Sequence, residues 1–118
     1  MLREMFQAKI HRAVVTECCL GYEGSLTVDI ELIERAGMLV NQKIQVLNIN
    51  NGERLETYLI AGERGKRQII VNGPAARLAQ AGDRVVVIAY ASLNEEEVLR
   101  HKPVVVVLDE RNQVLEVH

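Results

Sequence analysis

Residues Lys43–Ala61, with the sequence KIQVLNINNGERLETYLIA, specify the architecture of this chain. Apolar and polar residues alternate on both sides of the pair Asn51-Gly52, and a period of two predicts strands that each bury one face. Asn-Gly between two such runs is the strongest short signal for a β-hairpin with a type I′ turn. We therefore expect an antiparallel hairpin in which Arg54 and Tyr58 share one strand face and Thr57 lies on the other.

The rest of the chain repeats this pattern of short strands and tight turns. Further strands are expected over residues 5–19, 26–28, 68–71, 84–90, 104–108 and 113–117, and short helices over residues 30–36, 74–80 and after Asn94. The first region is one long strand or two short ones, because its alternation slips at Val14-Val15. Ala36-Gly37 and Ala81-Gly82 each end a helix and lead into a strand, a weak repeat of about 45 residues. We expect a mainly β, closed barrel with a few short helices; an open α+β sheet is the alternative.

Composition indicates a single domain with an aliphatic core. The 118 residues suit one domain, 1–118, and 48% of them are hydrophobic although only 3% are aromatic. A net charge of −2 disfavours nucleic acid as a partner. The N-terminal residues do not resemble a signal peptide, and the longest apolar run, Val104–Leu108, is too short to span a bilayer. We therefore expect a cytoplasmic protein that has neither a membrane nor a nucleic-acid partner.

Disulfide and metal chemistry are not indicated. The two cysteines, Cys18 and Cys19, are neighbours, and adjacent cysteines form a disulfide only with strain. We expect both to be reduced and structural. No metal site is expected, because the chain lacks ligands at a suitable spacing.

The stretch Tyr22-Glu-Gly-Ser25 has two interpretations. Gly-Ser is a common turn dipeptide, so the ordinary interpretation is a loop tip between two strands. The alternative is a reaction centre, in which the Ser25 hydroxyl attacks the carbonyl of Gly24. Glycine favours that reaction because it permits a bent backbone and leaves its carbonyl uncrowded.

Other candidate groups are equally ambiguous when each is taken alone. Arg54 can hold a carboxylate bidentately and Tyr58 can transfer a proton, but an exposed Arg beside a half-buried Tyr is common. The turn Asn72–Ala76 opens a helix whose free backbone N–H groups can bind an anion, or it is an ordinary helix start. Lys9 and His11 share a strand face, which can simply be a solvated exterior.

Taken together, the motifs form an ordered set that resembles one family. The matching stretches are MFQAKIHR (Met5–Arg12), YEGS (Tyr22–Ser25), NNGERLETY (Asn50–Tyr58), ERG (Glu63–Gly65), VNGPAA (Val71–Ala76) and AGD (Ala81–Asp83). In this order and spacing they resemble the pyruvoyl-dependent aspartate 1-decarboxylase family, from near the start of the chain to about residue 100. Pro74 stands where that family often has Ala.

The resemblance implies a double-psi β-barrel and a homotetramer with sites between subunits. It also implies self-cleavage between Gly24 and Ser25, which gives residues 1–24 (β chain) and 25–118 (α chain). The Ser25 hydroxyl would attack the Gly24 carbonyl, the resulting ester would eliminate to a dehydroalanine, and hydrolysis would leave a covalent pyruvoyl group. Either this maturation is spontaneous or it requires a maturation factor as a partner.

The implied activity is decarboxylation of L-aspartate to β-alanine and CO2 for pantothenate and coenzyme A biosynthesis. By resemblance, the substrate amine forms a Schiff base with the pyruvoyl group derived from Ser25, and Tyr58 is the proton donor. The substrate-binding residues implied in the same way are Thr57, Gly73, Pro74, Ala75, Arg54 and Lys9. For Arg54, this role agrees with the carboxylate clamp suggested by its residue type.

The rival hypothesis is a small non-enzymatic β-barrel that acts as a binding or DNA-regulating module. It remains open because one fold can serve many functions. The acidic pI of about 5.9 and the presence of the candidate motifs weigh against it.

Overall fold

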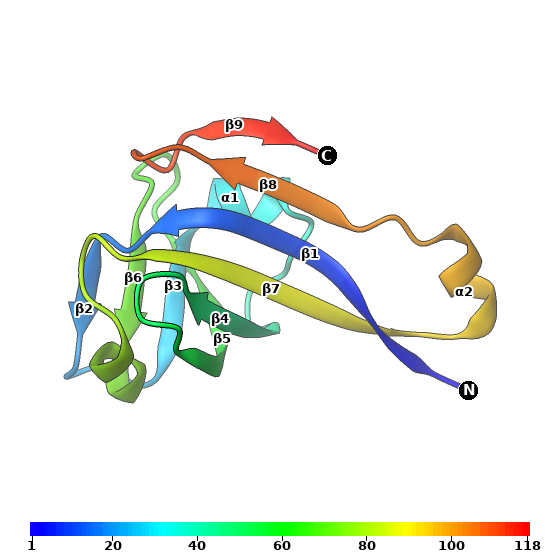
Figure 1. Cartoon of the computed structure of the whole chain (residues 1–118), viewed down its shortest axis with the longest axis horizontal. Helices are drawn as coiled ribbons and strands as arrows, with labels where there is room; N and C mark the ends of the chain where they lie inside the picture. Colours follow the sequence, from blue (N-terminus) through cyan, green and yellow to red (C-terminus); the bar gives the residue numbers. More distant parts are fainter.

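Nine strands and three short helices build the chain in this computed structural model, which describes all residues from 1 to 118 (Figure 1). The strands are β1 (Arg3–Val14), β2 (Glu17–Cys19), β3 (Ser25–Asp29), β4 (Lys43–Asn48), β5 (Arg54–Gly62), β6 (Ile69–Asn72), β7 (Arg84–Leu93), β8 (Val104–Leu108) and β9 (Val114–Val117). The helices are α1 (Ile30–Arg35), the 3₁₀ helix η1 (Gly73–Leu78) and α2 (Glu95–Arg100). None of these helices has the length and apolar character needed to cross a membrane.

The strands pair in the order β2-β6-β3-β5-β4-β7-β1-β8-β9. β2 follows β1 in the chain after only Val15 and Thr16, yet it pairs with β6 at the opposite end of that order. The backbone N–H of Thr16 also donates to the carbonyl of Ile69, at 2.8 Å. The β1–β2 segment therefore closes the sheet on itself, and the β8–β9 hairpin lies outside the closure. The fold is the mainly β, double-psi β-barrel expected from the sequence.

The expected hairpin is present, but its turn differs from the type I′ prediction. β4 and β5 pair antiparallel from Lys43 opposite Tyr58 to Leu47 opposite Arg54. Only Gly52 in the connecting loop has a positive φ, of 78°, whereas a type I′ turn needs two such residues. Asparagine side chains explain the longer loop: Oδ1 of Asn48 accepts from the N–H of Asn50, and Oδ1 of Asn51 accepts from the N–H of Glu53.

The first strand region is divided where its sequence pattern changes. β1 ends at Val14 and β2 begins at Glu17, so the region forms one long strand and one short strand. The slip at Val14-Val15 lies where the chain passes from β1, which pairs with β7 and β8, to β2, which pairs with β6. Register shifts in the pairing of β1 with β7 lie earlier, between Phe6 and Ala8 and between Ile10 and Ala13, and Arg12 in the second has a φ of 65°.

The barrel interior is aliphatic, as the composition predicts. Its core consists of 21 buried hydrophobic residues without any aromatic side chain, including Ile10 of β1, Leu26 of β3 and Val87 of β7. β7 lies between β4 and β1, which confirms residues 84–90 as a central strand. Burying such side chains contributes about 1.5–3 kcal/mol each, so alternation along the strands is enough to set the register.

A buried carboxylate fixes the end of β3 that lies away from Ser25. Asp29 is fully buried, caps α1 through the N–H of Glu31 at 2.9 Å, and accepts from the N–H of Gly65 and Arg67. The guanidinium of Arg67 also lies 3.2 Å from Asp29. Burial alone raises the pKa of Asp29, but the hydrogen bonds from Arg67, Glu31 and Gly65 outweigh it, and the pKa is lowered. The loop after β5 and the start of α1 are thus tied to one strand.

Candidate active site

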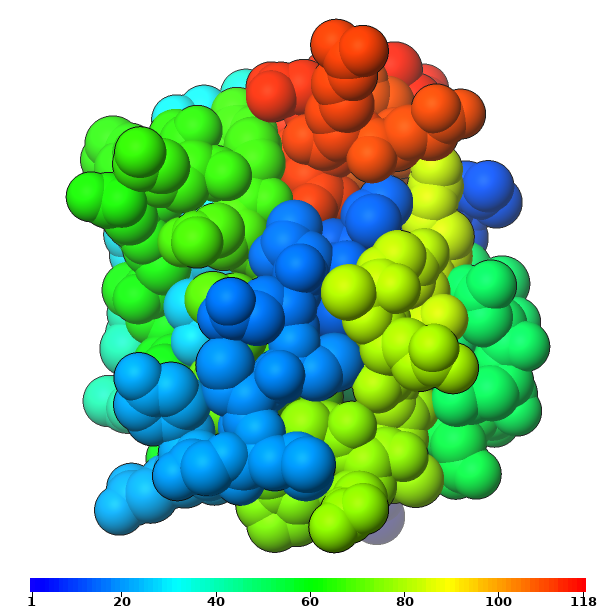
Figure 2. All heavy atoms as spheres, turned by 90° about the vertical axis from the view of Figure 1, so that its left-hand side faces the viewer, coloured from blue at the N-terminus to red at the C-terminus, as the bar shows by residue number.

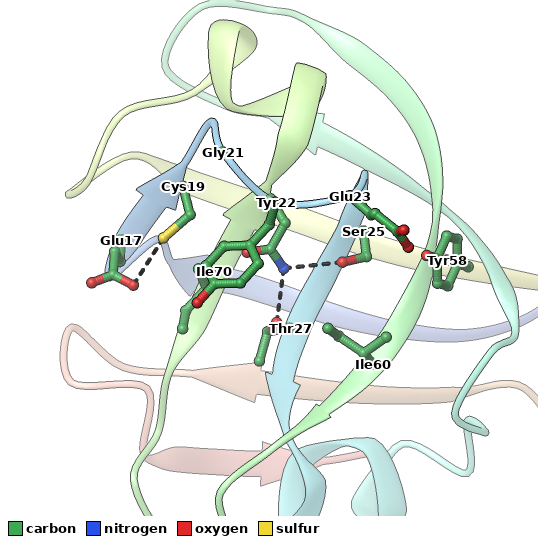
Figure 3. Close-up of a pocket in the computed structure, with 11 residues that line it drawn as sticks. Glu17, Cys19, Gly21, Tyr22, Glu23, Ser25, Thr27, Tyr58, Ile60 and Ile70 are labelled. Atoms are coloured by element: carbon green, nitrogen blue, oxygen red, sulfur yellow. Dashed lines mark hydrogen bonds between the residues drawn. The ribbon is translucent and has the colours of Figure 1, made fainter.

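A cavity of about 690 Å³ opens beside the first residue of β3 (Figure 3). β2, β3, β5, β6 and the loop before β3 contribute its walls, and β2 lies beside η1 at this end of the molecule (Figure 2). The lining residues are Glu17, Cys19, Gly21, Tyr22, Glu23, Ser25, Thr27, Tyr58, Ile60, Ile70 and Asn72. Two of the residues expected from the sequence to carry the chemistry, Ser25 and Tyr58, therefore share one cavity.

The Ser25 hydroxyl is buried and held by a neighbouring strand. Ser25 is 3% exposed and pairs with Asn72 of β6 in an antiparallel register. Nδ2 of Asn72 donates to Oγ of Ser25 at 3.0 Å and to Oγ1 of Thr27 at 2.9 Å, as the dashed lines in Figure 3 show. A buried hydroxyl with a fixed donor is pre-organised for reaction, because its oxygen does not need to be desolvated first.

The peptide before Ser25 is packed against Gly73. A Cβ atom added to Gly73 would lie 2.7 Å from Cα and N of Gly24 and from the carbonyl oxygen of Tyr22. Gly73 also has a φ of 70°, so both space and conformation require glycine here. A Cβ atom added to Gly24 would lie 3.6 Å from Cδ of Pro74, at ordinary van der Waals distance. The predicted segment Gly73–Ala75 thus backs the Gly24 peptide and does not line the cavity.

Tyr58 reaches the cavity from β5. Parallel pairing places Leu26 opposite Leu59, and this register brings Tyr58 next to Ser25. Tyr58 is 37% exposed, and its hydroxyl makes no hydrogen bond within the chain. A phenol that is free on the cavity side can bind or protonate a substrate. Thr57 lies on the opposite face of the strand, as alternation predicts, and does not line the cavity.

The two predicted cations lie outside this cavity. Arg54 lines a second cavity of about 470 Å³, where its guanidinium donates to Oε1 of Gln45 at 3.0 Å. Arg54 lies four positions before Tyr58 on β5, a span of about 13 Å. Lys9 lies over the ring of Phe6, with Nζ 5.0 Å from the ring centre. A single chain therefore does not bring Arg54 or Lys9 to Ser25.

Several cavity residues were not predicted as such from the sequence. Asn72 belongs to a motif that suggested an anion-binding or ordinary helix start, with no role for the Asn72 side chain, and Thr27 is one residue of a short strand without a distinctive pattern. Cys19 was expected to be merely structural, yet it lines the cavity. Its Sγ donates to Oε2 of Glu17 at 3.2 Å, and this hydrogen bond raises the pKa of the thiol. Both cysteines are free, as expected.

The residues around Ser25 fit the precursor of a pyruvoyl group. The Ser25 hydroxyl already accepts a hydrogen bond from Asn72. The preceding residue, Gly24, packs so closely on Gly73 that Gly73 cannot carry a side chain. The hydroxyl and the Gly24 carbonyl belong to adjoining residues, as an acyl shift requires. No cluster of three or more metal-ligating side chains is present anywhere in the chain.

Comparison with known proteins identifies the family of the chain. Residues 1–115 match the family model described as aspartate decarboxylase. Proteins named aspartate 1-decarboxylase are similar along nearly the whole chain. The one from Caldicellulosiruptor saccharolyticus is 55% identical, with 98% of this chain and 90% of the relative covered. The relative from Bacillus licheniformis is 53% identical, with 98% of this chain and 91% of the relative covered. The relative from Sulfurimonas denitrificans is 50% identical, with 99% of this chain and 97% of the relative covered. The chain therefore belongs to the aspartate decarboxylase family of enzymes.

Proposed function

We propose that this protein is a cytoplasmic, pyruvoyl-dependent decarboxylase that converts L-aspartate to β-alanine and CO2 for pantothenate and coenzyme A biosynthesis. The observation that carries the proposal is the buried Ser25 hydroxyl, held by Asn72 at the end of a Gly24 peptide that packs on Gly73. Family membership supports the same substrate and reaction. No observation favours the non-enzymatic alternative.

Maturation begins with the Ser25 hydroxyl. Oγ of Ser25 forms a bond to the carbonyl carbon of Gly24, the C–N bond of that peptide breaks, and the hydroxyl proton passes to the nitrogen of Ser25. The Cα proton of residue 25 is then lost and its Cβ–Oγ bond breaks, which releases Gly24 as a carboxylate. Water replaces the nitrogen on the remaining enamine, ammonia leaves, and residue 25 becomes pyruvoyl. Oxidant and reductant are not needed, because one water enters and one ammonia departs.

The cofactor supplies an electron-withdrawing carbonyl that accepts the electron pair left when CO2 departs. The chain supplies the rest. Tyr58, whose hydroxyl is free in the cavity, gives a proton to the carbon that has lost its carboxylate. The family resemblance supports substrate binding by Thr57 and the segment Gly73–Ala75, although within one chain neither lines the Ser25 cavity. Arg54 and Lys9 hold its carboxylates, since each is a cation that can form charge-assisted hydrogen bonds.

These roles require more than one copy of the chain, and we propose a homotetramer with sites between subunits. Arg54 lies about 13 Å along β5 from Tyr58 and in a different cavity, so it can reach Ser25 only on a neighbouring copy. Complementation tests this arrangement. Ser25→Ala and Arg54→Ala chains are each expected to be inactive, and chains refolded together should regain part of the activity. Activity that stays absent in the mixture would place Arg54 and Ser25 of one chain in the same site.

The activity itself is tested with aspartate labelled in its α-carboxylate. The purified, cleaved protein should release labelled CO2 and form β-alanine, and Ser25→Ala should release none. Aspartate labelled only in its side-chain carboxylate is the matched control, from which the label should stay in β-alanine. A fully cleaved protein that releases no CO2 from either substrate would refute aspartate as the substrate while leaving self-cleavage intact.

A further inference from the structure

Asn72 occupies a helix-capping position but does not cap the helix. It is the residue before η1 and has an extended backbone, with φ −106° and ψ 147°, yet its side chain makes no capping hydrogen bond. Asparagine at such a position normally accepts a backbone N–H of its own helix. The amide is instead turned toward β3, where Ser25 and Thr27 lie. A side chain that does not make the capping hydrogen bond its position favours is expected where a functional site needs that side chain for another contact.

The amide nitrogen of Asn72 uses both of its hydrogens on β3. One goes to Oγ of Ser25 at 3.0 Å and the other to Oγ1 of Thr27 at 2.9 Å. Ser25 and Thr27 are two residues apart on the strand, so their hydroxyls project from the same face. Asn72 is only 5% exposed, and every fully buried side-chain polar atom of the protein has a partner. The Thr27 hydroxyl is therefore the second contact of an amide whose other N–H points at Ser25.

We propose that Thr27 is a positioning residue for self-cleavage: its hydroxyl holds the Asn72 amide so that Asn72 donates a hydrogen bond to Oγ of Ser25 while that oxygen reacts. The inference rests on the proposed function. Negative charge develops on Oγ when it loses its proton in the acyl shift, and again when the Cβ–Oγ bond breaks in the elimination. An N–H donor stabilises both transition states. A rotated amide would present Oδ1, an acceptor, and would disfavour both.

Two substitutions at Thr27 separate this role from simple packing. Thr27→Val keeps the β-branched shape and removes the hydroxyl, whereas Thr27→Ser keeps the hydroxyl and removes the methyl group. We expect Thr27→Val to slow self-cleavage by about 2- to 10-fold, the effect of losing one hydrogen bond. Thr27→Ser should cleave at close to the rate of the unchanged chain. A packing role predicts the opposite order, and that order would overturn the inference.

Thr16→Val is the matched control. Thr16 also bonds β6 through its hydroxyl, which donates to the carbonyl of Ile69 at 3.1 Å and accepts from its N–H at 3.0 Å. The control therefore loses similar contacts with the same strand but leaves the Asn72 amide untouched, and its cleavage rate should not change. Equal slowing of Thr16→Val and Thr27→Val would show a general loss of stability and would overturn the positioning role.

The cleavage rate is followed by intact mass in freshly purified precursor. As a further readout, Thr27→Val should have no additional effect on the rate in an Asn72→Ala background, because the two groups act through one hydrogen bond. Independent, additive effects would contradict the inference. An unchanged chain that never cleaves would overturn the proposed function and this inference with it, whereas cleavage insensitive to Thr27→Val would overturn the inference alone.

Discussion

Gly73→Ala should slow self-cleavage through a contact that the structure defines. The added Cβ would lie 2.7 Å from N and Cα of Gly24 and from the Tyr22 carbonyl oxygen. Ordinary van der Waals contact begins near 3.4 Å, so the Gly24 backbone must move by about 0.7 Å. A displacement of that size in a reacting group costs on the order of 10- to 100-fold in rate. The positive φ adds about 1–2 kcal/mol of strain for a residue with a side chain.

Gly37→Ala is the control for that strain. Gly37 has a φ of 71° against 70° for Gly73, and a Cβ added to it would meet nothing within 4 Å. Gly37→Ala should lose about 1–2 kcal/mol of stability, and Gly73→Ala at least as much, in urea unfolding of the precursors measured at one protein concentration. Only Gly73→Ala should also cleave more slowly, as measured by intact mass over time. Cleavage of Gly73→Ala at the rate of Gly37→Ala would refute the claim that Gly73 positions the Gly24 peptide.

Two further variants test the site and the scaffold. Tyr58→Phe should cleave normally, because the Tyr58 hydroxyl makes no hydrogen bond to Ser25 Oγ. Its decarboxylation rate should fall by about 100-fold or more, the usual contribution of a positioned general acid. Normal turnover would remove Tyr58 from the mechanism. Asp29→Asn should cost about 3 kcal/mol of stability at neutral pH, since it leaves Arg67 without its buried partner. The pKa of Asp29 is lower in the folded chain than in the unfolded chain. The ionised carboxylate therefore contributes its full share of the folding stability above the unfolded-state pKa of about 3.9, and this stability is lost as the pH falls through the folded-state pKa. Urea unfolding at several pH values should therefore show that the stability of Asp29→Asn falls less on acidification than that of the unchanged chain. The same fall in stability for both chains would contradict this reasoning.

Features determined by neighbouring residues could be predicted from the sequence. Gly37 follows the end of α1 as expected, because a C′ glycine acts within one turn of the helix. Alternation placed Arg54 and Tyr58 on one face of β5 for the same reason. The prediction of a type I′ turn at Asn51-Gly52 was wrong, because hydrogen bonds from asparagine side chains, and not the dipeptide alone, determine the conformation of that loop.

Contacts between distant parts of the chain could not be derived from local patterns. Asn72 and Ser25 are 47 residues apart, and only the pairing of β3 with β6 brings them together. Barrel closure likewise depends on β2 meeting β6, a pairing that no single strand pattern encodes. The many short strands and tight turns favoured a closed barrel, but they did not say which strands close it. The placement of Arg54 in a separate cavity also follows from tertiary structure.

Intact-mass spectrometry of the purified protein tests the central claim, that Ser25 becomes the cofactor by cleavage of its own chain. The 13.2 kDa chain should convert to fragments of ~2.7 and ~10.5 kDa, in proportion to residues 1–24 and 25–118. The larger fragment should be lighter, by the mass of one ammonia molecule, than a fragment that begins with serine. An intact chain after prolonged warming, or a larger fragment that still begins with Ser25, would contradict the claim.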